Sequence, residues 1–276
     1  MSPLKAKEFP LQMSPFEFKS TTTLVTGASS GLGVEFARQI AARRGDLVLV
    51  ARTRERLDAV AEELRAKHQI EITTLPADLS EPAGVGEVIQ FAADQRINVL
   101  INNAGFGTYG KFAELDPARE HAEIMVNVAA PVDLAHALLP GMLASRSGGI
   151  ITVASAIGFQ PGPGQAVYGA TKAFALSFSE ALWAETRGTG IRVVVLCPGP
   201  TATGFLSGLG DERAASSSIY RRAADPAQVV RAALSGFDRD EMTIVPGARN
   251  RLLAQGYRFT PRKQMARLSG RMLAPH

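Results

Sequence analysis

The chain has 276 residues, of which 46% are apolar and 20% charged, and it contains one cysteine. This composition is typical of a soluble globular protein with a sizeable core, and it excludes a disordered chain or a disulfide framework. No apolar run reaches the roughly 18–20 residues of a membrane span, and Lys and Glu interrupt the first 20 residues where a signal peptide is apolar, so we expect a cytoplasmic protein.

The net charge of +4 is unevenly distributed. Seven of the 30 Lys and Arg residues lie in 249–276, a segment without Asp or Glu, so the rest of the chain is slightly acidic. An acidic body without a recognition motif is not expected to bind nucleic acid.

After an expected arm at 1–20, strand-like and helix-like segments alternate. Short β-branched runs that are apolar on both faces occur at 21–27, 46–51, 70–77, 97–105, 149–155, 191–199 and 242–247. Segments with helical spacing separate them at 31–44, 54–68, 81–95, 116–144, 166–187 and 226–237. This order predicts one α/β domain over 21–247, a doubly wound parallel seven-stranded sheet (Rossmann fold) with helices on both faces and a ligand site at the carboxyl ends of the strands.

The first predicted strand leads into a glycine-rich turn at the start of a helix. Such a turn lets the backbone approach a pyrophosphate, whose charge meets the unpaired N–H groups of the helix. A tight turn with no ligand is the alternative. We expect nucleotide contacts from Gly27, Ser29, Ser30, Gly31, Leu32 and Gly33.

The second strand ends at Arg52 and Thr53, where NAD-binding folds usually place an acid for the ribose 2′-hydroxyl. A guanidinium there suits a 2′-phosphate, with the Thr53 hydroxyl beside it. The cofactor that this pattern predicts is NADP (NADPH/NADP+). A solvated surface arginine is the alternative.

Two further strand ends are expected to line the same cleft. Asp78 and Leu79 follow the third strand, where Asp78 either accepts from an adenine amino group or caps a helix. Asn103, Ala104 and Gly105 follow the fourth strand, where small residues leave room for a ribose or nicotinamide, and the neighbouring Asn102 is interpreted as structural.

Ser155 ends the fifth strand, and Tyr168 and Lys172 lie four residues apart on the next helix, so both face one cleft. An ammonium beside a phenol favours the phenolate and lowers the phenol pKa toward neutrality. These residues predict a carbonyl/alcohol oxidoreductase with Tyr168 as general acid/base and Ser155 holding the substrate oxygen. The alternative is an interfacial aromatic beside a solvated lysine.

In these motifs the chain resembles the short-chain dehydrogenases/reductases, in their single-domain NADP-preferring branch, over about residues 21–247. TGASSGLG at 26–33, NNAG at 102–105, Asn127, Ser155, YGATK at 168–172 and PGPTAT at 198–203 occur in the family order. The resemblance implies that Asn127 kinks its helix and holds a water that links Lys172 to solvent, and that Lys172 binds the nicotinamide ribose. It also implies contacts to the cofactor from Pro198, Gly199, Thr201 and Thr203. Without the resemblance, a structural role for Asn127 stays open.

Two loops, 156–166 and 200–222, are expected to frame the substrate, the second as a mobile lid. Phe106, Phe159, Phe205 and Leu206 would give a largely apolar pocket, which predicts an apolar small-molecule carbonyl or alcohol as substrate. The four histidines and the single Cys197 show no metal-ligand spacing, so we expect no metal.

The basic tail 248–276 carries Met265, Leu268 and Met272 at helical spacing. We expect it to pack on its own domain or on a neighbouring subunit. A membrane-surface helix and a contact with an acidic carrier protein are alternatives ranked lower. The resemblance implies a homodimer or homotetramer through helices 116–144 and 166–187.

Two other functions remain alternatives at this point. A non-catalytic dinucleotide sensor would not require Ser155, Tyr168 and Lys172 together. An epimerase or dehydratase on the same fold resembles a longer family with TGxxGxxG and a larger carboxyl-terminal lobe, and this chain has neither feature.

Overall fold

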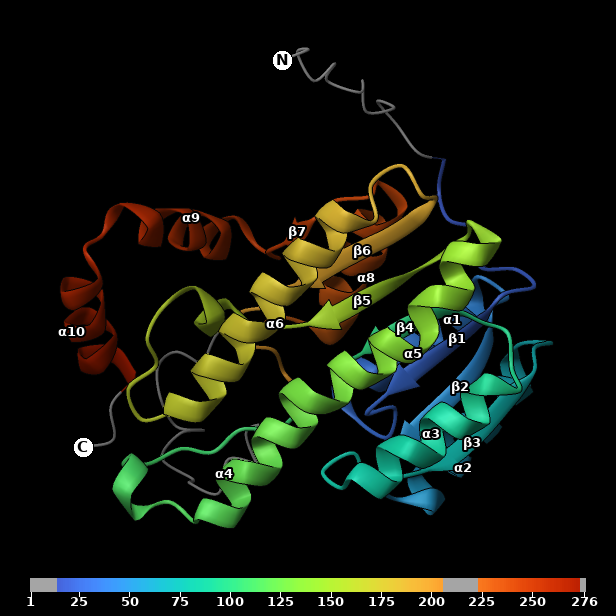
Figure 1. Ribbon diagram of the computed structural model, residues 1–276, viewed down its shortest axis with the longest axis horizontal. Coiled ribbons are helices and arrows are strands. Elements are labelled where there is room, and N and C mark those ends of the chain that lie inside the picture. The colour runs from blue at the N-terminus through green and yellow to red at the C-terminus, as the bar shows by residue number, and fades with distance from the viewer. Residues whose placement is uncertain (1–13, 206–222, 274–276) are drawn as a thin grey trace, which may run out of the picture.

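The computed structural model describes residues 14–205 and 223–273. Within them, one parallel seven-stranded sheet has the order β3-β2-β1-β4-β5-β6-β7 (Figure 1). The strands are β1 (Thr22–Thr26), β2 (Asp46–Ala51), β3 (Ile72–Pro76), β4 (Ile97–Asn102), β5 (Gly148–Val153), β6 (Ile191–Leu196) and β7 (Thr243–Ile244). The strand order reverses between β1 and β4, which is where such sheets bind ligands.

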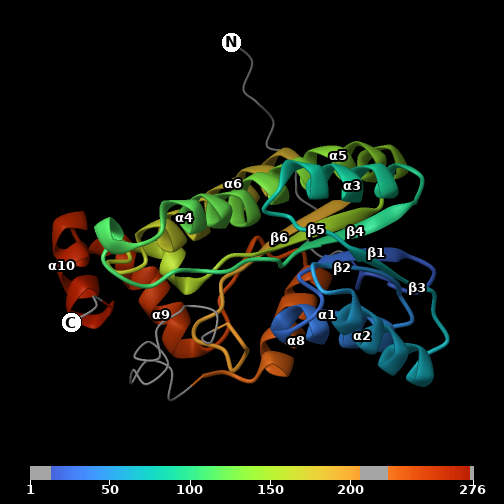
Figure 2. The ribbon, with the colours of Figure 1, turned by 90° about the horizontal axis from the view of Figure 1, so that it is seen from below.

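Helices cover both faces of the sheet, which confirms the predicted doubly wound fold (Figure 2). One face carries α1 (Gly31–Ala42), α2 (Arg54–Lys67) and α8 (Pro226–Asp238). The other carries α3 (Pro82–Ala93), α4 (Pro117–Ile124), α5 (Ala130–Ser145) and α6 (Ala166–Glu185).

Alternate strand residues feed two separate hydrophobic cores, because successive side chains point to opposite faces. The core under α1, α2 and α8 contains Val25, Leu49, Ile101 and Val194. The core under α3 and α5 contains Leu24, Val48, Leu100 and Val193. This is why the central strands read as apolar on both faces.

The predicted helix 116–144 is continuous in direction but changes its hydrogen bonding. A π-helical segment, Met125–Ala129, separates α4 from α5 and contains Asn127. Helix 117–145 has the length and hydropathy of a membrane span, yet buried Leu134, Leu138 and Met142 pack on the sheet core, as in a core helix of a sheet protein. Inserted π-turns of this kind are frequent at functional sites.

Residues 14–20, expected as part of an arm, pack against the end of the sheet opposite the ligand edge. Phe18 is buried, and Phe16 stacks edge-on with Phe18 and Phe237 at centroid distances of 4.9 and 5.2 Å. The buried guanidinium of Arg192 lies over the rings of Phe16 and Phe237 and donates to the carbonyl oxygens of Phe237 and Asp238.

The basic tail forms α9 (Ala248–Gly256), a 3₁₀ turn (Tyr257–Phe259) and α10 (Arg262–Leu273). Met265 and Ser269 of α10 are buried, and the Ser269 hydroxyl donates to Gln160 Oε1 at 3.2 Å. Leu268, expected on the same stripe as Met265, is 48% exposed. The contact between α10 and the loop after Ser155 therefore determines which residues of α10 are buried.

Replacing Phe237 by Ala should lower the free energy of unfolding by about 3–5 kcal/mol, since it leaves a cavity beneath the Phe16 and Phe18 rings. Urea denaturation measures this loss. Phe259→Ala is the matched control, because that ring is 88% exposed and its removal should change stability by less than about 0.5 kcal/mol. Equal losses in the two variants would contradict the assignment of Phe237 to the core.

Candidate active site

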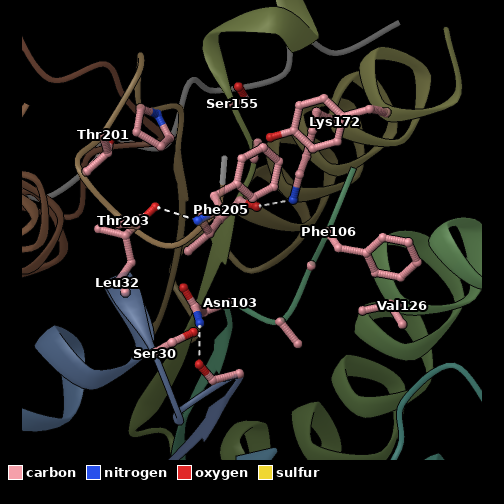
Figure 3. Close-up of a pocket in the computed structure, with 18 of the residues that line it drawn as sticks. Ser30, Leu32, Asn103, Phe106, Val126, Ser155, Lys172, Thr201, Thr203 and Phe205 are labelled. Carbon is pink, nitrogen blue, oxygen red and sulfur yellow. Dashed lines mark hydrogen bonds between the residues drawn. The ribbon is translucent and has the colours of Figure 1, made fainter. Parts of the chain in front are cut away.

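A cavity of about 1140 Å³ lies at the carboxyl edge of the sheet, beside the switch between β1 and β4. Figure 3 shows Ser30 and Asn103 on one side of it and Ser155, Lys172 and Phe205 on the other. The predicted site residues that line it are Gly27, Ser29, Ser30, Gly31, Leu32, Arg52, Thr53, Asp78, Leu79, Asn103, Ala104, Gly105, Ser155, Tyr168, Lys172, Pro198, Gly199, Thr201 and Thr203. Two other predicted residues, Gly33 and Asn127, lie behind its wall.

The glycine-rich turn brings β1 and α1 into close contact. Gly27 and Gly31 have φ angles of +65° and +55°, in the left-handed region that favours glycine. A Cβ on Gly33 would lie 2.1 Å from the carbonyl oxygen of Gly27. Gly33 therefore permits the packing of α1 on β1, and only the other turn residues face the cavity.

The start of α1 fits an anionic group. Ser30 is the N-cap residue but makes no side-chain capping bond, and the first turn contains no acid. The first N–H groups of a helix lack partners inside it and carry its positive dipole end. Across the cleft, Thr203 packs so close that a Cβ on Gly31 would lie 3.1 Å from the Thr203 Cβ. Thr203 thus closes one side of the helix start, and the free N–H groups beside this contact could hold the pyrophosphate of a dinucleotide.

A cationic corner follows at the ends of β2 and β3. Arg52 is 75% exposed, and its Nη1 lies 4.0 Å from Asp78 Oδ2. Burial alone would raise the pKa of Asp78, but hydrogen bonds from the Ser80 hydroxyl and N–H, together with the charge of Arg52, lower it. Arg56 also lines this corner, although sequence reasoning missed it. Its place in the first turn of α2, directly after Arg52 and Thr53, was the available signal.

Side-chain hydrogen bonds join the ends of β1 and β4. Asn103 Nδ2 donates to the carbonyl oxygens of Thr26 and Gly27 at 2.8 and 3.3 Å, and the Thr26 hydroxyl oxygen accepts the backbone N–H groups of Asn103 and Ala104. Buried Asn102 donates to the Pro131 carbonyl oxygen at 3.2 Å. Asn103 is therefore both a strand link and part of the cavity wall.

The ammonium of Lys172 is buried at the centre of the site. It donates to the Val153 carbonyl oxygen at 2.9 Å and lies 5.8 Å from the centroid of the Tyr168 ring. Burial lowers the pKa of Lys172 to about 8, while Glu123 and Cys197 oppose that shift. Tyr168 and Lys172 thus face one cavity from successive turns of α6, as their spacing predicted.

Asn127 connects the π-helical segment to two neighbouring elements. Its Nδ2 donates to the Phe106 carbonyl oxygen at 2.9 Å and to the Thr171 hydroxyl oxygen at 3.0 Å, and its Oδ1 accepts the Phe106 N–H at 3.2 Å. A Cβ on Gly105 would lie 2.9 Å from this Oδ1 and 3.3 Å from Lys172 Nζ. Glycine at 105 therefore lets the chain pass between the amide and the ammonium.

Ser155 caps the 3₁₀ turn Ala156–Phe159, its Oγ accepting the Ile157 N–H at 3.3 Å. This bond uses the oxygen as an acceptor and leaves the hydroxyl hydrogen for a ligand. Ser155, Tyr168 and Lys172 together can hold a carbonyl oxygen and exchange a proton with it.

The substrate end differs from the expectation at Phe159. Phe106 and Phe205 line the cavity, and the Phe205 ring lies 5.3 Å from that of Tyr168. Phe159 does not line it, because the ring packs instead against the small core beneath α6 and α9. Leu206 and the rest of the predicted lid from 206 to 222 lie outside the described residues.

Several wall residues were not found from the sequence. Gln160 and Gln165 were not singled out, although they belong to the loop 156–166 that was expected to frame the substrate; outside the predicted site segments are Arg119, Arg249, Asn250, Leu253 and Tyr257. The last four come from α9 and the turn after it, where no motif marks a site. The guanidinium of Arg119 lies 5.4 Å from the centroid of the Phe106 ring, so the apolar wall also carries positive charge. Among the described residues, no group of three or more His, Cys, Asp or Glu side chains is placed to hold a metal ion.

The family model for short chain dehydrogenases matches residues 21–214. Sulfoacetaldehyde reductase 2 from Chromohalobacter salexigens is 36% identical over 207 residues, which are 73% of this chain and 81% of that protein.

Two solved structures extend the similarity to the fold. A short-chain dehydrogenase from Sphingobium yanoikuyae in complex with NADPH has 37% identity and a TM-score of 0.79, covering 87% of this chain and 93% of that one. The bulky-bulky ketone specific alcohol dehydrogenase from Comamonas testosteroni has 34% identity and a TM-score of 0.75, covering 87% and 92%.

Gly33→Ala should weaken dinucleotide binding at least tenfold and lower thermal stability, because the added Cβ forces α1 away from the Gly27 carbonyl group. Calorimetric titration and thermal unfolding measure the two effects. Gly86→Ala in α3 is the matched control, since a Cβ there meets no atom within 4 Å. The control should bind normally and gain about 0.5–1 kcal/mol. Unchanged binding in Gly33→Ala would contradict the close-packing argument.

Proposed function

Since this chain belongs to the short-chain dehydrogenase/reductase family, we propose that it interconverts a carbonyl and a secondary alcohol with NADP(H). The observation that supports this most is the buried Lys172 ammonium facing the same cavity as the Tyr168 ring and the Ser155 hydroxyl. A bound nicotinamide would supply or accept the hydride. The chain's own residues then have to hold the substrate oxygen and move its proton.

Tyr168 is the general acid/base in this proposal. An ammonium close to the phenol stabilises the phenolate more than the neutral phenol, which lowers the pKa of Tyr168. Because the Lys172 pKa is about 8, the ammonium is charged at neutral pH. Ser155 donates to the substrate oxygen and stabilises the negative charge that develops there during reduction.

Asn127 acts behind the cavity wall. Its side chain ties Phe106 and Thr171 to the π-helical segment, which holds Gly105 against Lys172. We propose that this region carries the proton between Lys172 and solvent, as the family resemblance implies. A non-catalytic sensor is disfavoured because it would not require Ser155, Tyr168 and Lys172 together. An epimerase or dehydratase is disfavoured because the chain lacks the TGxxGxxG motif and the larger carboxyl-terminal lobe of that longer family.

The cofactor preference follows from the cationic corner. Arg52 and Arg56 both line it, and Thr53 adds a hydroxyl. A 2′-phosphate would receive charge-assisted hydrogen bonds there, whereas the Asp78 carboxylate alone would favour a ribose hydroxyl. Because the two guanidinium groups outnumber the single carboxylate of Asp78, this corner of the cavity supports a preference for NADPH.

The substrate is proposed to be a small molecule with an apolar body next to its carbonyl group. Phe106, Phe205 and Leu253 supply apolar surface, and Arg119 and Arg249 add positive charge to the same wall. The similar proteins are named for sulfoacetaldehyde and for bulky ketones, so their names do not agree on one substrate.

We further propose a cytoplasmic homodimer or homotetramer that associates through α4, α5 and α6. Ile124, Leu143 and Phe174 on these helices are 41%, 37% and 41% exposed, and an apolar hollow of about 350 Å³ lies between α4 and α6. Apolar surface of this kind is typical of subunit contacts.

Arg52→Ala should raise the KM for NADPH about 10- to 100-fold and leave the KM for NADH within about twofold, because only the 2′-phosphate loses charge-assisted hydrogen bonds. Steady-state kinetics with both cofactors measure the ratio. Arg54→Ala is the control, since Arg54 is exposed but does not line the cavity. An equal change with both cofactors would overturn the assignment.

Tyr168→Phe should reduce kcat more than about 100-fold while NADPH affinity stays within about threefold. The assay follows NADPH oxidation with the best substrate of the wild type among ketones, aldehydes, quinones and 3-oxoacyl thioesters. Activity within tenfold of the wild type would show that another group is the acid/base. A wild type inactive on the whole panel but able to bind NADPH would favour a sensor.

A further inference from the structure

Two acids lie in the protein core beside the proposed active site. Glu120 and Glu123 of α4 are 7% and 0% exposed, and their spacing puts both on the inner face of the helix. Buried carboxyl groups are rare unless they are paired, because leaving water costs several kcal/mol. The proposed mechanism assigns neither of them a role.

Among the described residues, the hydrogen-bond partner of Glu123 is Thr108, which lies two residues after Phe106 of the cavity wall. The buried Thr108 hydroxyl donates to Glu123 Oε2 at 3.1 Å. Glu123 Oε1 and both carboxyl oxygens of Glu120 have no hydrogen-bond partner within the described part of the chain. Thr108 therefore fixes the direction of the Glu123 carboxyl group, while Glu120 lacks such an anchor.

Thr108 ends the short segment that runs from β4 past the ammonium and the phenol. A Cβ on Gly105 would lie 3.3 Å from Lys172 Nζ, and one on Gly107 would lie 3.0 Å from Tyr168 Cδ2. Asn127 holds the middle of this segment through both backbone bonds to Phe106, as described above. The Thr108–Glu123 bond is thus its second attachment to the same helix.

The buried groups around the Thr108–Glu123 bond shift one another's pKa values in opposite directions. Burial raises the pKa of Glu123 to about 7; Thr108 and Lys172 oppose this rise, and Glu120 adds to it. In the other direction, Glu123 favours the charged form of Lys172. Cys197 also faces Lys172, but burial and the nearby Glu180 raise its pKa to about 12, so the thiol is neutral at pH 7. Glu123 is therefore the acid that balances the buried ammonium.

We propose that Glu123 is a positioning residue, whose carboxylate anchors the 105–108 segment through Thr108 and stabilises the positive charge of Lys172. This inference rests on the proposed function of Tyr168 and Lys172. If this is so, the charge of Glu123 influences how readily Tyr168 and Lys172 exchange protons at the carboxyl edge of the sheet.

The test is the pH dependence of kcat/KM for carbonyl reduction in Glu123→Gln. Without the negative charge, the Lys172 ammonium releases its proton at lower pH, so the form with a charged ammonium beside the phenol is lost earlier. The alkaline limb of the profile should therefore move to lower pH by at least about half a unit. A loss of packing alone would lower activity at every pH and leave the limb in place.

Three variants separate charge from anchoring. Glu120→Gln removes the neighbouring acid and should leave the alkaline limb within about 0.2 unit, since Glu120 is not a charge partner of Lys172. Glu123→Asp should restore the wild-type limb because it keeps the charge. Thr108→Val should raise KM and move the limb less than Glu123→Gln does, because the carboxyl group is kept while its anchor is lost.

A spectroscopic titration of Tyr168, which needs no substrate, provides a second measurement. The ultraviolet absorbance of tyrosinate, taken as the difference between each variant and its Tyr168→Phe counterpart, reports the pKa of Tyr168 directly. That pKa should rise in Glu123→Gln, because the phenolate loses its neighbouring ammonium at lower pH. An unshifted limb and an unshifted Tyr168 titration in a folded Glu123→Gln protein would overturn the proposal. Retained activity in Tyr168→Phe would instead show that the proposed function itself is wrong.

Discussion

The burial of one ammonium group is the constraint on which the cavity at the carboxyl edge of the sheet depends. Lys172 is 5% exposed, and a cation taken out of water is stable only when protein groups replace its hydration. The Val153 carbonyl oxygen supplies one such contact, and Glu123 supplies an opposing charge. The incomplete compensation leaves a cation whose pKa is about 8, which is near the range where proton transfer at neutral pH is most efficient.

The segment after β4 links this ammonium to the nucleotide end of the cavity. Its first residues, Asn103 and Ala104, bond to Thr26 at the end of β1, next to the glycine-rich turn. Its later residues pass Lys172 and Tyr168 and are fastened to α4 and the π-helical segment. One short stretch of backbone thereby fixes the distance between the place for a dinucleotide and the place for a proton donor.

The cavity wall across from the strand ends comes from helices near the carboxyl terminus and not from the sheet. Arg249, Asn250 and Leu253 come from α9, which follows β7 directly, and Asn250 Nδ2 packs within 2.5 Å of where a Cβ on Gly199 would be. α10 then braces the loop after Ser155 through Ser269. The sheet edge thus forms one side of the cavity, whereas helix α9, which follows the last strand, forms part of the opposite side.

The sequence alone determined the parallel sheet and the residues at its edge. Runs apolar on both faces have no stable place except between two helix layers, and parallel strands deliver their carboxyl ends to one edge. Ser155, Tyr168 and Lys172 were predictable for the same reason, since local spacing on a strand end and a helix settles their direction. Arg52 and Asp78 follow from the strand ends as well.

Only the tertiary structure decided which residues outside these motifs reach the site. Arg119, Leu253 and Tyr257 enter the cavity because of how α4 and α9 pack, and that packing has no local sequence pattern. The same holds for Glu123, whose helical spacing marks it as a residue of α4 but not as a core acid. Phe159 shows the opposite case, because this aromatic residue lies near Ser155 in the sequence but its ring packs into the core. Burial and charge balance depend on neighbours distant in sequence, so they exist only once the chain is folded.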